Sequence, residues 1–358
     1  MQLSQDFLHR SGLTCALLVL GGFGGFIASK LSVPMPWMLG ALMASAGLVL
    51  VRPPLVLNEY SFPTGLRSGF VGLIGVMIGA QVTPDLVTVL PEMPLTIAAL
   101  ALFVGLCFAG NLVIFERLGG YDRATAFFSG TPGGLLESIV MGEESGADIR
   151  ILTTQQFLRV IAVIALVPLG LSLWLGHPVG SAAGLSAALP DHPVTVQSLA
   201  LVIAAALTGF AMAKKLRLPA GQLTGPLLLT AALNLSGIVD IHLPSWMVAA
   251  AQLVIGVSLG LRFQGVDGAL LRRSLWLCMI SVSYMLGLGL CFAFALHQFT
   301  QIEFLHLFIS FAPGGVAEMS IIALSLAANP ALVSLIHVIR ILMTVAAMPI
   351  IGRWMKLR

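Results

Sequence analysis

Apolar segments follow one another along the whole chain, and this pattern leaves few folds open to it. Twelve runs are long enough to be membrane helices, and no stretch remains for a separate soluble domain. They lie at 12–29, 34–51, 66–82, 94–115, 122–142, 151–175, 196–213, 220–239, 245–261, 274–297, 303–327 and 331–352. Only 9% of the 358 residues are charged, whereas soluble domains carry about 25%. We therefore predict an all-α integral membrane protein whose first run is a retained helix, not a cleaved signal.

Motifs of the first half return in the second half at a nearly constant offset in residue number. The matched pairs are Pro132-Gly133-Gly134 with Pro313-Gly314-Gly315, Glu137 with Glu318, Arg159 with Arg340, 74–79 with 255–260, and Lys30-Leu31 with Lys215-Leu216. The offset is identical in all pairs except the last, where it is slightly larger. We predict two homologous repeats, residues 1–185 and 186–358, joined by a polar linker at about 176–195.

Lysine and arginine residues predict the direction of each repeat, because basic loops stay in the cytoplasm. Loops that carry lysine or arginine alternate with loops that lack them only if the fifth segment of each repeat enters and leaves the membrane on the same side. Each repeat then has five transmembrane helices and one re-entrant hairpin, and the odd number of spans inverts the second repeat. Both termini fall in the cytoplasm, and Lys30 is the one basic residue outside. We expect a multi-pass protein of the bacterial inner (cytoplasmic) membrane.

The fifth segments carry the strongest functional signal. Each has Pro-Gly-Gly near its middle, at Pro132 and Pro313, and proline with paired glycines breaks a helix. Broken backbone at membrane depth persists only where protein buries it or where it lines a cavity, and matching broken segments point to a transporter binding site. Two broken helices that cross each other are the alternative geometry.

The residues around these breaks are candidates for binding a solute. Freed N–H groups suit an anion, freed carbonyls suit a cation, and charged groups in apolar segments are functional candidates. The candidates are Ser129, Thr131, Pro132, Gly133, Gly134, Glu137 and Arg159, and then Ser310, Pro313, Gly314, Gly315, Glu318 and Arg340. The two arginines are expected either to bind the solute or to form ion pairs with the two glutamates.

Four further polar residues have secondary roles. Gln155, Gln156 and His337 lie within one turn of the arginines, and His337 matches Gln156 at the common offset. Asp148 is expected to cap a helix, as is Asn329 at the matching place in the second repeat.

Taken together, these motifs resemble the bacterial membrane AbrB family, which has an internal duplication. The resemblance rests on Ser129 to Glu137, Gly146-Ala147-Asp148 and Gln156 with Arg159, and it covers nearly the whole chain. The second copy departs from it at Ala312, Asn329 and His337. The resemblance implies a regulatory or transport role, and some members carry the label ammonia monooxygenase. The architecture also resembles the cation–proton antiporter/anion transporter superfamily, including citrate-type carriers.

We expect a secondary-active transporter or exporter of a small charged organic solute, driven by a proton or sodium gradient around a site at the membrane midplane. The alternative is a membrane-embedded regulator that senses a ligand and affects gene expression indirectly. A membrane-embedded oxygenase would need a metal, and the scattered histidines give no metal spacing. We expect no enzymatic activity, no cofactor and no nucleic-acid binding. The expected partners are the lipid bilayer, the solute and, as an option, a second copy in a homodimer.

Overall fold

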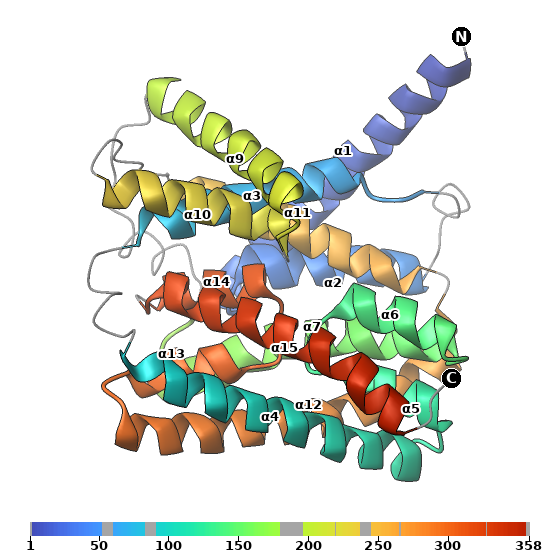
Figure 1. Ribbon diagram of the computed structural model, residues 1–358. Coiled ribbons are helices and arrows are strands. Elements are labelled where there is room, and N and C mark those ends of the chain that lie inside the picture. The colour runs from blue at the N-terminus through green and yellow to red at the C-terminus, as the bar shows by residue number, and fades with distance from the viewer. Residues whose placement is uncertain are drawn as a thin grey trace. The chain divides into compact units, whose positions relative to one another are not determined.

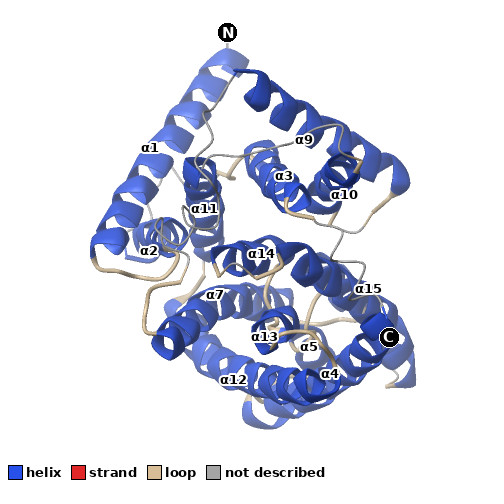
Figure 2. Ribbon diagram, turned by 90° about the vertical axis from the view of Figure 1, so that its left-hand side faces the viewer, coloured by secondary structure: helices blue, strands red, loops and turns tan. Residues whose placement is uncertain are grey.

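The computed structural model describes residues 2–51, 60–82, 91–179, 196–218, 220–236, 245–264, 266–326 and 328–355. Over these residues the protein has fourteen α-helices, and no strand (Figure 1, Figure 2). Seven helical segments are long and apolar enough to cross a membrane: Arg10–Lys30, Met93–Leu118, Ile149–Leu175, Leu199–Leu216, Trp246–Phe263, Gly268–Phe299 and Pro330–Trp354. Helix length and composition thus confirm an all-α, multi-pass membrane protein. Most of the predicted linker, residues 180–195, lies outside the described residues.

The helices form two compact units, and each unit contains helices from both halves of the sequence. The first unit is Met1–Gln81, Pro168–Val266 and Leu324–Ala327. Its helices are α1 (Gln2–Lys30), α2 (Pro36–Val51), α3 (Thr64–Ala80), α9 (Val196–Leu216), α10 (Gly221–Leu235) and α11 (Ser245–Gly260), followed by the 3-10 turn Leu261–Phe263. Helix α1 packs on α2 and α9 on α10, while α3 packs on α10 and α11 on α2.

Glycine pairs let the first two pairs of helices meet backbone to backbone. A Cβ atom on Gly40 of α2 would collide with the carbonyl of Gly24 on α1. In the same way, a Cβ atom on Gly225 of α10 would collide with the carbonyl of Gly209 on α9. Small residues at crossings permit this close approach in membrane proteins. Gly209 follows Gly24, and Gly225 follows Gly40, at the same offset in residue number that relates Lys30 to Lys215.

The turns that lead into α2 and α10 share an unusual backbone. Ser32 and Met35 have φ angles of 54° and 46°, and Arg217 and Ala220 have φ angles of 53° and 48°. Non-glycine residues seldom adopt this left-handed region. The two turns therefore place strained residues at matching positions, at the same offset as the glycine pairs.

The second unit is Val82–Val167, Asp267–Ala323 and Ala328–Arg358. Its helices are α4 (Met93–Val113) with the π-helical turn Ile114–Leu118, α5 (Arg123–Ser129), α6 (Leu135–Glu144), α7 (Ile149–Leu175), α12 (Gly268–Phe299), α13 (Phe304–Phe311), α14 (Val316–Ser325) and α15 (Pro330–Trp354). The end of α7, from Pro168 on, belongs to the first unit. The starts of α13, α14 and α15 follow those of α5, α6 and α7 at one constant offset, the same as that between Pro132 and Pro313.

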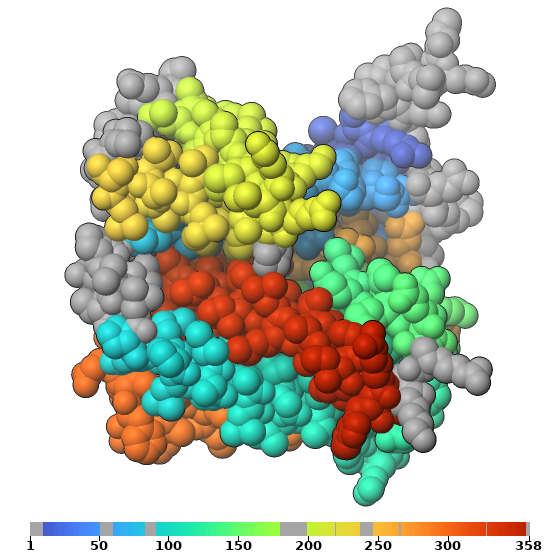
Figure 3. All heavy atoms as spheres, viewed as in Figure 1, coloured from blue at the N-terminus to red at the C-terminus, as the bar shows by residue number. Residues whose placement is uncertain are grey.

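The short helices of this unit are held by its long ones. Helix α13 packs on α12 and α15, and α5 packs on α4 and α6. In Figure 2, α13 and α5 lie within the outline of α4, α12 and α15. Figure 3 shows the side chains of α15, in red, against those of α4, in blue-green, in agreement with the contact between these helices.

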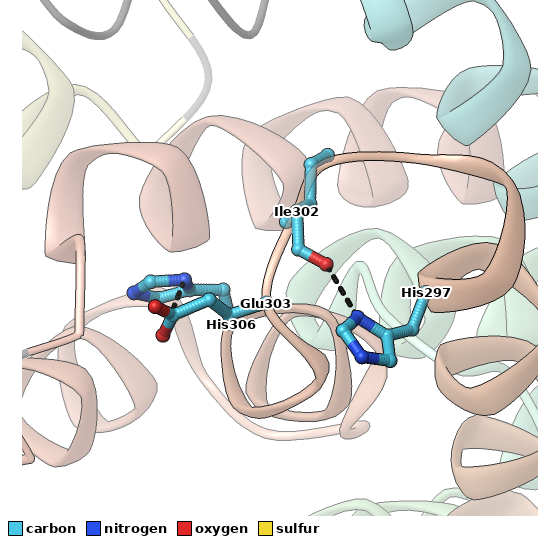
Figure 4. A network of polar contacts seen from close by, with 4 residues as sticks. All are labelled: His297, Ile302, Glu303 and His306. Carbon is cyan, nitrogen blue, oxygen red and sulfur yellow. Dashed lines mark hydrogen bonds and ion pairs between the residues drawn. The ribbon is translucent and has the colours of Figure 1, made fainter.

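The turn between α12 and α13 is fixed by polar contacts (Figure 4). The His297 Nδ1 atom lies 2.9 Å from the carbonyl oxygen of Ile302, and the His306 Nδ1 atom lies 3.7 Å from a carboxylate oxygen of Glu303. The backbone N–H of Gln301 donates to both carboxylate oxygens of Glu92, at 2.9 and 2.8 Å. These contacts connect the loop before α13 to the end of α12 and to Glu92.

Candidate functional site

The predicted breaks in both fifth segments are present. The first segment is helical to Ser129 and again from Leu135, and the second is helical to Phe311 and again from Val316. Gly134, at the start of α6, has a φ angle of 62°, which explains the glycine because side chains disfavour that conformation. A proline precedes the glycines in each break and cannot donate a helical hydrogen bond. The residues of both breaks are buried except Gly315, which is half-buried.

Side chains hold the first break in a closed network. Thr131 Oγ1 and Ser138 Oγ are 2.7 Å apart, and Ser138 Oγ donates to the Gly134 carbonyl at 2.6 Å. Gln156 Nε2, on α7, donates to Thr131 Oγ1 and to the Phe128 carbonyl, both at 2.7 Å. These contacts satisfy backbone and hydroxyl groups that the break exposes in an apolar interior.

Two further helices help to enclose the first break. Asn111 on α4 donates from Nδ2 to the Gly130 carbonyl at 3.0 Å and accepts from Ser281 Oγ on α12 at 2.7 Å. Asn111 was not predicted from the sequence, because it is a lone uncharged amide and the candidates in the apolar segments are mainly charged residues. An uncharged polar side chain inside an apolar run would have been the signal to find it.

An arginine reaches each break from the helix that follows it. Arg159 on α7 donates from Nη1 to the Thr131 carbonyl. Arg340 on α15 donates from Nη1 to the Ala312 carbonyl and from Nη2 to the Gly314 carbonyl, the latter at 2.7 Å. Arg159 is 6% exposed and Arg340 is fully buried. The guanidinium groups thus take the place of the helical donors that the breaks remove.

The expected ion pairs between these arginines and the glutamates are not formed within the described part of the chain. Glu137 is exposed, and Glu318 is buried with 6% of its surface accessible. Both lie in the first turns of their helices, α6 and α14, where the helix dipole favours a negative charge. The guanidinium groups instead donate to carbonyls that the breaks open.

The two breaks and the two arginines belong to one cluster. Arg159 and Arg340 are close enough for their charges to interact, and Cys107 of α4 lies near both. A Cβ atom on Gly133 would lie 3.5 Å from Thr344 Oγ1 and 3.6 Å from Ile341 Cγ1. The first break therefore packs on α15 within about one turn of Arg340.

Several buried polar atoms of this cluster have no hydrogen-bond partner in the described residues. They are Ser129 Oγ, Ser310 Oγ, Arg159 Nε, Arg340 Nε, Gln156 Oε1 and His337 Nε2. The first four form two pairs of equivalent positions in the two halves of the sequence. Buried polar groups in folded proteins are nearly always paired, so this concentration at one place suits a site that receives polar atoms from a bound molecule.

The secondary candidates fall at different places. Gln156 lies at the first break. The His337 Nδ1 atom lies 2.9 Å from the carbonyl oxygen of Val333, and the ring faces the Ala312 carbonyl at the second break. Gln155 instead donates from Nε2 to the Tyr121 hydroxyl at 3.0 Å, away from the breaks.

The expected helix caps at Asp148 and Asn329 are confirmed. Asp148 Oδ1 accepts from the N–H groups of Arg150 and Ile151, at 2.9 and 3.2 Å. Asn329 Oδ1 accepts from two N–H groups of α15, both at 3.1 Å. Both side chains therefore hold helix starts and leave the breaks to other residues.

Comparison with known proteins gives a match over most of the chain. The profile of the family described as "Transition state regulatory protein AbrB" matches residues 51–356. The chain is similar to "Putative regulator AbrB" of Escherichia coli (strain K12), with 28% identity over 356 residues and 96% of each chain covered. It is also similar to "Uncharacterized protein YhjN" of Bacillus subtilis (strain 168), with 25% identity over 347 residues, 93% of this chain and 90% of the relative.

Proposed function

This chain belongs to the membrane AbrB family, and from that premise we propose that it is a secondary-active transporter or exporter of a small charged organic solute. The solute binds where the two broken helices meet the arginines. The binding residues are Ser129, Thr131, Pro132, Gly133, Gly134 and Arg159, with Ser310, Pro313, Gly314, Gly315 and Arg340. Glu137 and Glu318 flank the site from the first turns of α6 and α14.

The observation that carries this proposal is the pair of buried arginines at two broken helices. A buried charge is costly unless it is paired, and no carboxylate lies within ion-pair distance of Arg159 or Arg340 among the described residues. A packing role alone does not account for two such charges beside unpartnered serine hydroxyls. Ionisable groups within membrane segments mark solute or ion pathways, and broken helices supply binding sites in secondary transporters.

We further propose that the chain consists of two inverted repeats, each with five transmembrane helices and one re-entrant hairpin. The constant offset between matching helix starts supports two repeats, as do the matching left-handed turns. In the first unit, a helix of each half packs closely on a helix of the other half. A Cβ on Gly75 of α3 would collide with the Leu223 carbonyl of α10, and a Cβ on Gly256 of α11 would collide with the Met38 carbonyl of α2. Such reciprocal packing is expected of two copies related by a twofold axis.

In this proposal both termini are cytoplasmic and the protein resides in the bacterial inner membrane. A proton or sodium gradient supplies the energy, and one group of helices moves against the other to give alternating access. The protein is not an enzyme, binds no nucleic acid and needs no cofactor. It works in the lipid bilayer, with a homodimer as an optional assembly.

Electrical recording from reconstituted protein tests the proposal. Proteoliposomes adsorbed on a solid-supported membrane would be exposed to organic acids, amino acids and amines, each with and without sodium and at two pH values. Transport predicts a saturable current or proton movement for at least one class, absent from protein-free vesicles. A complete lack of solute-dependent movement across all classes would count against a transporter.

The name of the Escherichia coli relative includes the word regulator, which favours a sensor as the second candidate. A sensor would keep the ligand site without a transport cycle. It would bind a solute in detergent yet move none across a vesicle membrane, so the two measurements together separate these functions.

A further inference from the structure

We propose that the site formed by Arg159 and Arg340 binds an anion, specifically the carboxylate of a small organic acid. This inference rests on the proposed function for its biological use, but the binding itself can be tested without transport. Its structural basis is an excess of positive charge and of unpartnered polar groups at one buried place.

The charge balance of the cluster favours an anion. The two guanidinium groups bring two positive charges, and carbonyls of the breaks, just after the ends of α5 and α13, accept hydrogen bonds from them. A helix C-terminus acts at most as about half a negative charge, and α5 and α13 have only 7 and 8 residues. Roughly one unit of positive charge therefore remains at the guanidinium groups even if both helix ends count in full. Glu318 lies in the first turn of α14, where the positive end of that helix dipole offsets part of its charge. One carboxylate would neutralise it.

The unused hydrogen-bond donors fit the same ligand. Arg159 and Arg340 donate Nη hydrogen bonds to the break carbonyls. Both Nε atoms are buried and have no hydrogen-bond partner among the described residues. A guanidinium carries several N–H groups in a planar fork that matches a carboxylate. The hydroxyls of Ser129 and Ser310, 3% and 0% exposed, are likewise unpartnered among the described residues and supply two further donors next to the breaks. A cation would face two like charges, with the hydroxyl lone pairs and Gln156 Oε1 as unpartnered side-chain acceptors.

Aromatic rings beside each break favour an organic anion. Phe127 and Phe128 precede the first break, and their ring centroids are 5.0 Å apart in an edge-to-face pair. Phe311 precedes the second break, 5.3 Å from the Phe103 ring and 5.8 Å from the Phe292 ring. An apolar surround strengthens the attraction between charges and suits the hydrocarbon part of an organic acid.

The test is thermal stability of the full-length protein in detergent, titrated with acetate, lactate, succinate and benzoate. Methylamine, sodium chloride and sodium sulfate at matched ionic strength are the comparison compounds. The variants are Ser129→Ala, Ser310→Ala and Arg159→Lys with Arg340→Lys, since each serine hydroxyl has no protein partner to lose. Thr230→Val, which removes another buried unpartnered hydroxyl in the first unit, is the matched control.

We expect at least one organic acid to raise the melting temperature in a saturable way, by mass action on the folded state. Each serine variant should weaken the apparent affinity about tenfold, as expected for one hydrogen bond to a charged group, and Thr230→Val should leave it unchanged. Stabilisation by methylamine alone, a full effect from chloride or sulfate, or equal acid binding in all variants would overturn the assignment. Acid binding without any flux would instead reject the transporter and keep the anion site. Flux of an amine would support the transporter and reject the anion site.

Discussion

The Nη2 atom of Arg340 lies 2.7 Å from the carbonyl oxygen of Gly314, inside the second break of the chain. The same guanidinium also binds the Ala312 carbonyl, so one side chain spans the proline between them. A helix that stops in an apolar environment leaves carbonyls without donors. The arginine supplies those donors and, in doing so, places a positive charge at the break.

Loss of Arg340 should therefore cost more stability than loss of Arg159. Arg340→Met removes the donors of two buried carbonyls, which predicts a loss of about 2–4 kcal/mol in the free energy of unfolding. Arg159→Met removes the donor of one, at a break that Gln156 and Asn111 also hold, and should cost about 1–2 kcal/mol. Denaturant unfolding in detergent measures both. The exposed Arg353 on the same helix α15 is the control, and Arg353→Met should change little. A larger loss from Arg159→Met than from Arg340→Met would contradict this ranking.

Glu318 should be energetically independent of Arg340. Glu318→Gln removes a charge from the first turn of α14, where its interaction with the helix dipole is worth about 0.3–1 kcal/mol. Removing one partner of a buried ion pair would cost about 3–5 kcal/mol instead. A double-mutant cycle with Arg340→Met distinguishes these cases, and we expect a coupling energy near zero. Coupling above about 2 kcal/mol would restore the ion-pair interpretation.

Gly134 should not tolerate a side chain. Its φ angle is 62°, and a Cβ atom would lie 3.0 Å from Val345 Cγ2 and 3.2 Å from Met348 Cε. Gly134→Ala should lower the free energy of unfolding by about 1–3 kcal/mol through backbone strain. Gly105 lies inside α4 with open space around it, so Gly105→Ala should be neutral or stabilising. Equal effects of the two substitutions would show that the left-handed turn is dispensable.

If the two halves are repeats, alanine substitutions at the two glycine crossings of the first unit should lower the melting temperature to a similar extent. Gly40→Ala and Gly225→Ala each force a methyl group against the backbone of the facing helix, at Gly24 and Gly209. Both should lower the melting temperature by a similar amount, because both push apart helices in backbone contact. Gly47→Ala, with nothing within 4 Å of the new atom, is the control on α2. A large effect at only one of the two crossings would argue against equivalent packing.

The sequence was sufficient to predict the membrane class, the two helix breaks and the caps at Asp148 and Asn329. These features depend on local chemistry: apolar length, proline with glycine, and a short polar side chain before a helix. The helix starts of the second unit also keep the offset seen in the motifs.

The sequence was not sufficient to predict the partners of the arginines. A glutamate and an arginine at the same spacing in both halves, as in Glu137 with Arg159, suggest an ion pair, but the direction of backbone carbonyls at a break depends on tertiary structure. Gln155 and Gln156 show the same limit. They are neighbours in the sequence, yet one contacts Tyr121 and the other contacts Thr131, because adjacent residues of a helix point about 100° apart.

The most direct test of transport through the Arg159 and Arg340 site is uptake of a radiolabelled organic acid into proteoliposomes under an imposed proton or sodium gradient. The acid is one that stabilises the purified protein, and the variants are Ser129→Ala with Ser310→Ala, beside Thr230→Val. Transport through this site predicts saturable, gradient-dependent uptake that the serine variants reduce by about tenfold or more and that Thr230→Val leaves intact. Uptake no greater than in protein-free vesicles, by protein that binds the same acid in detergent, would contradict transport through this site.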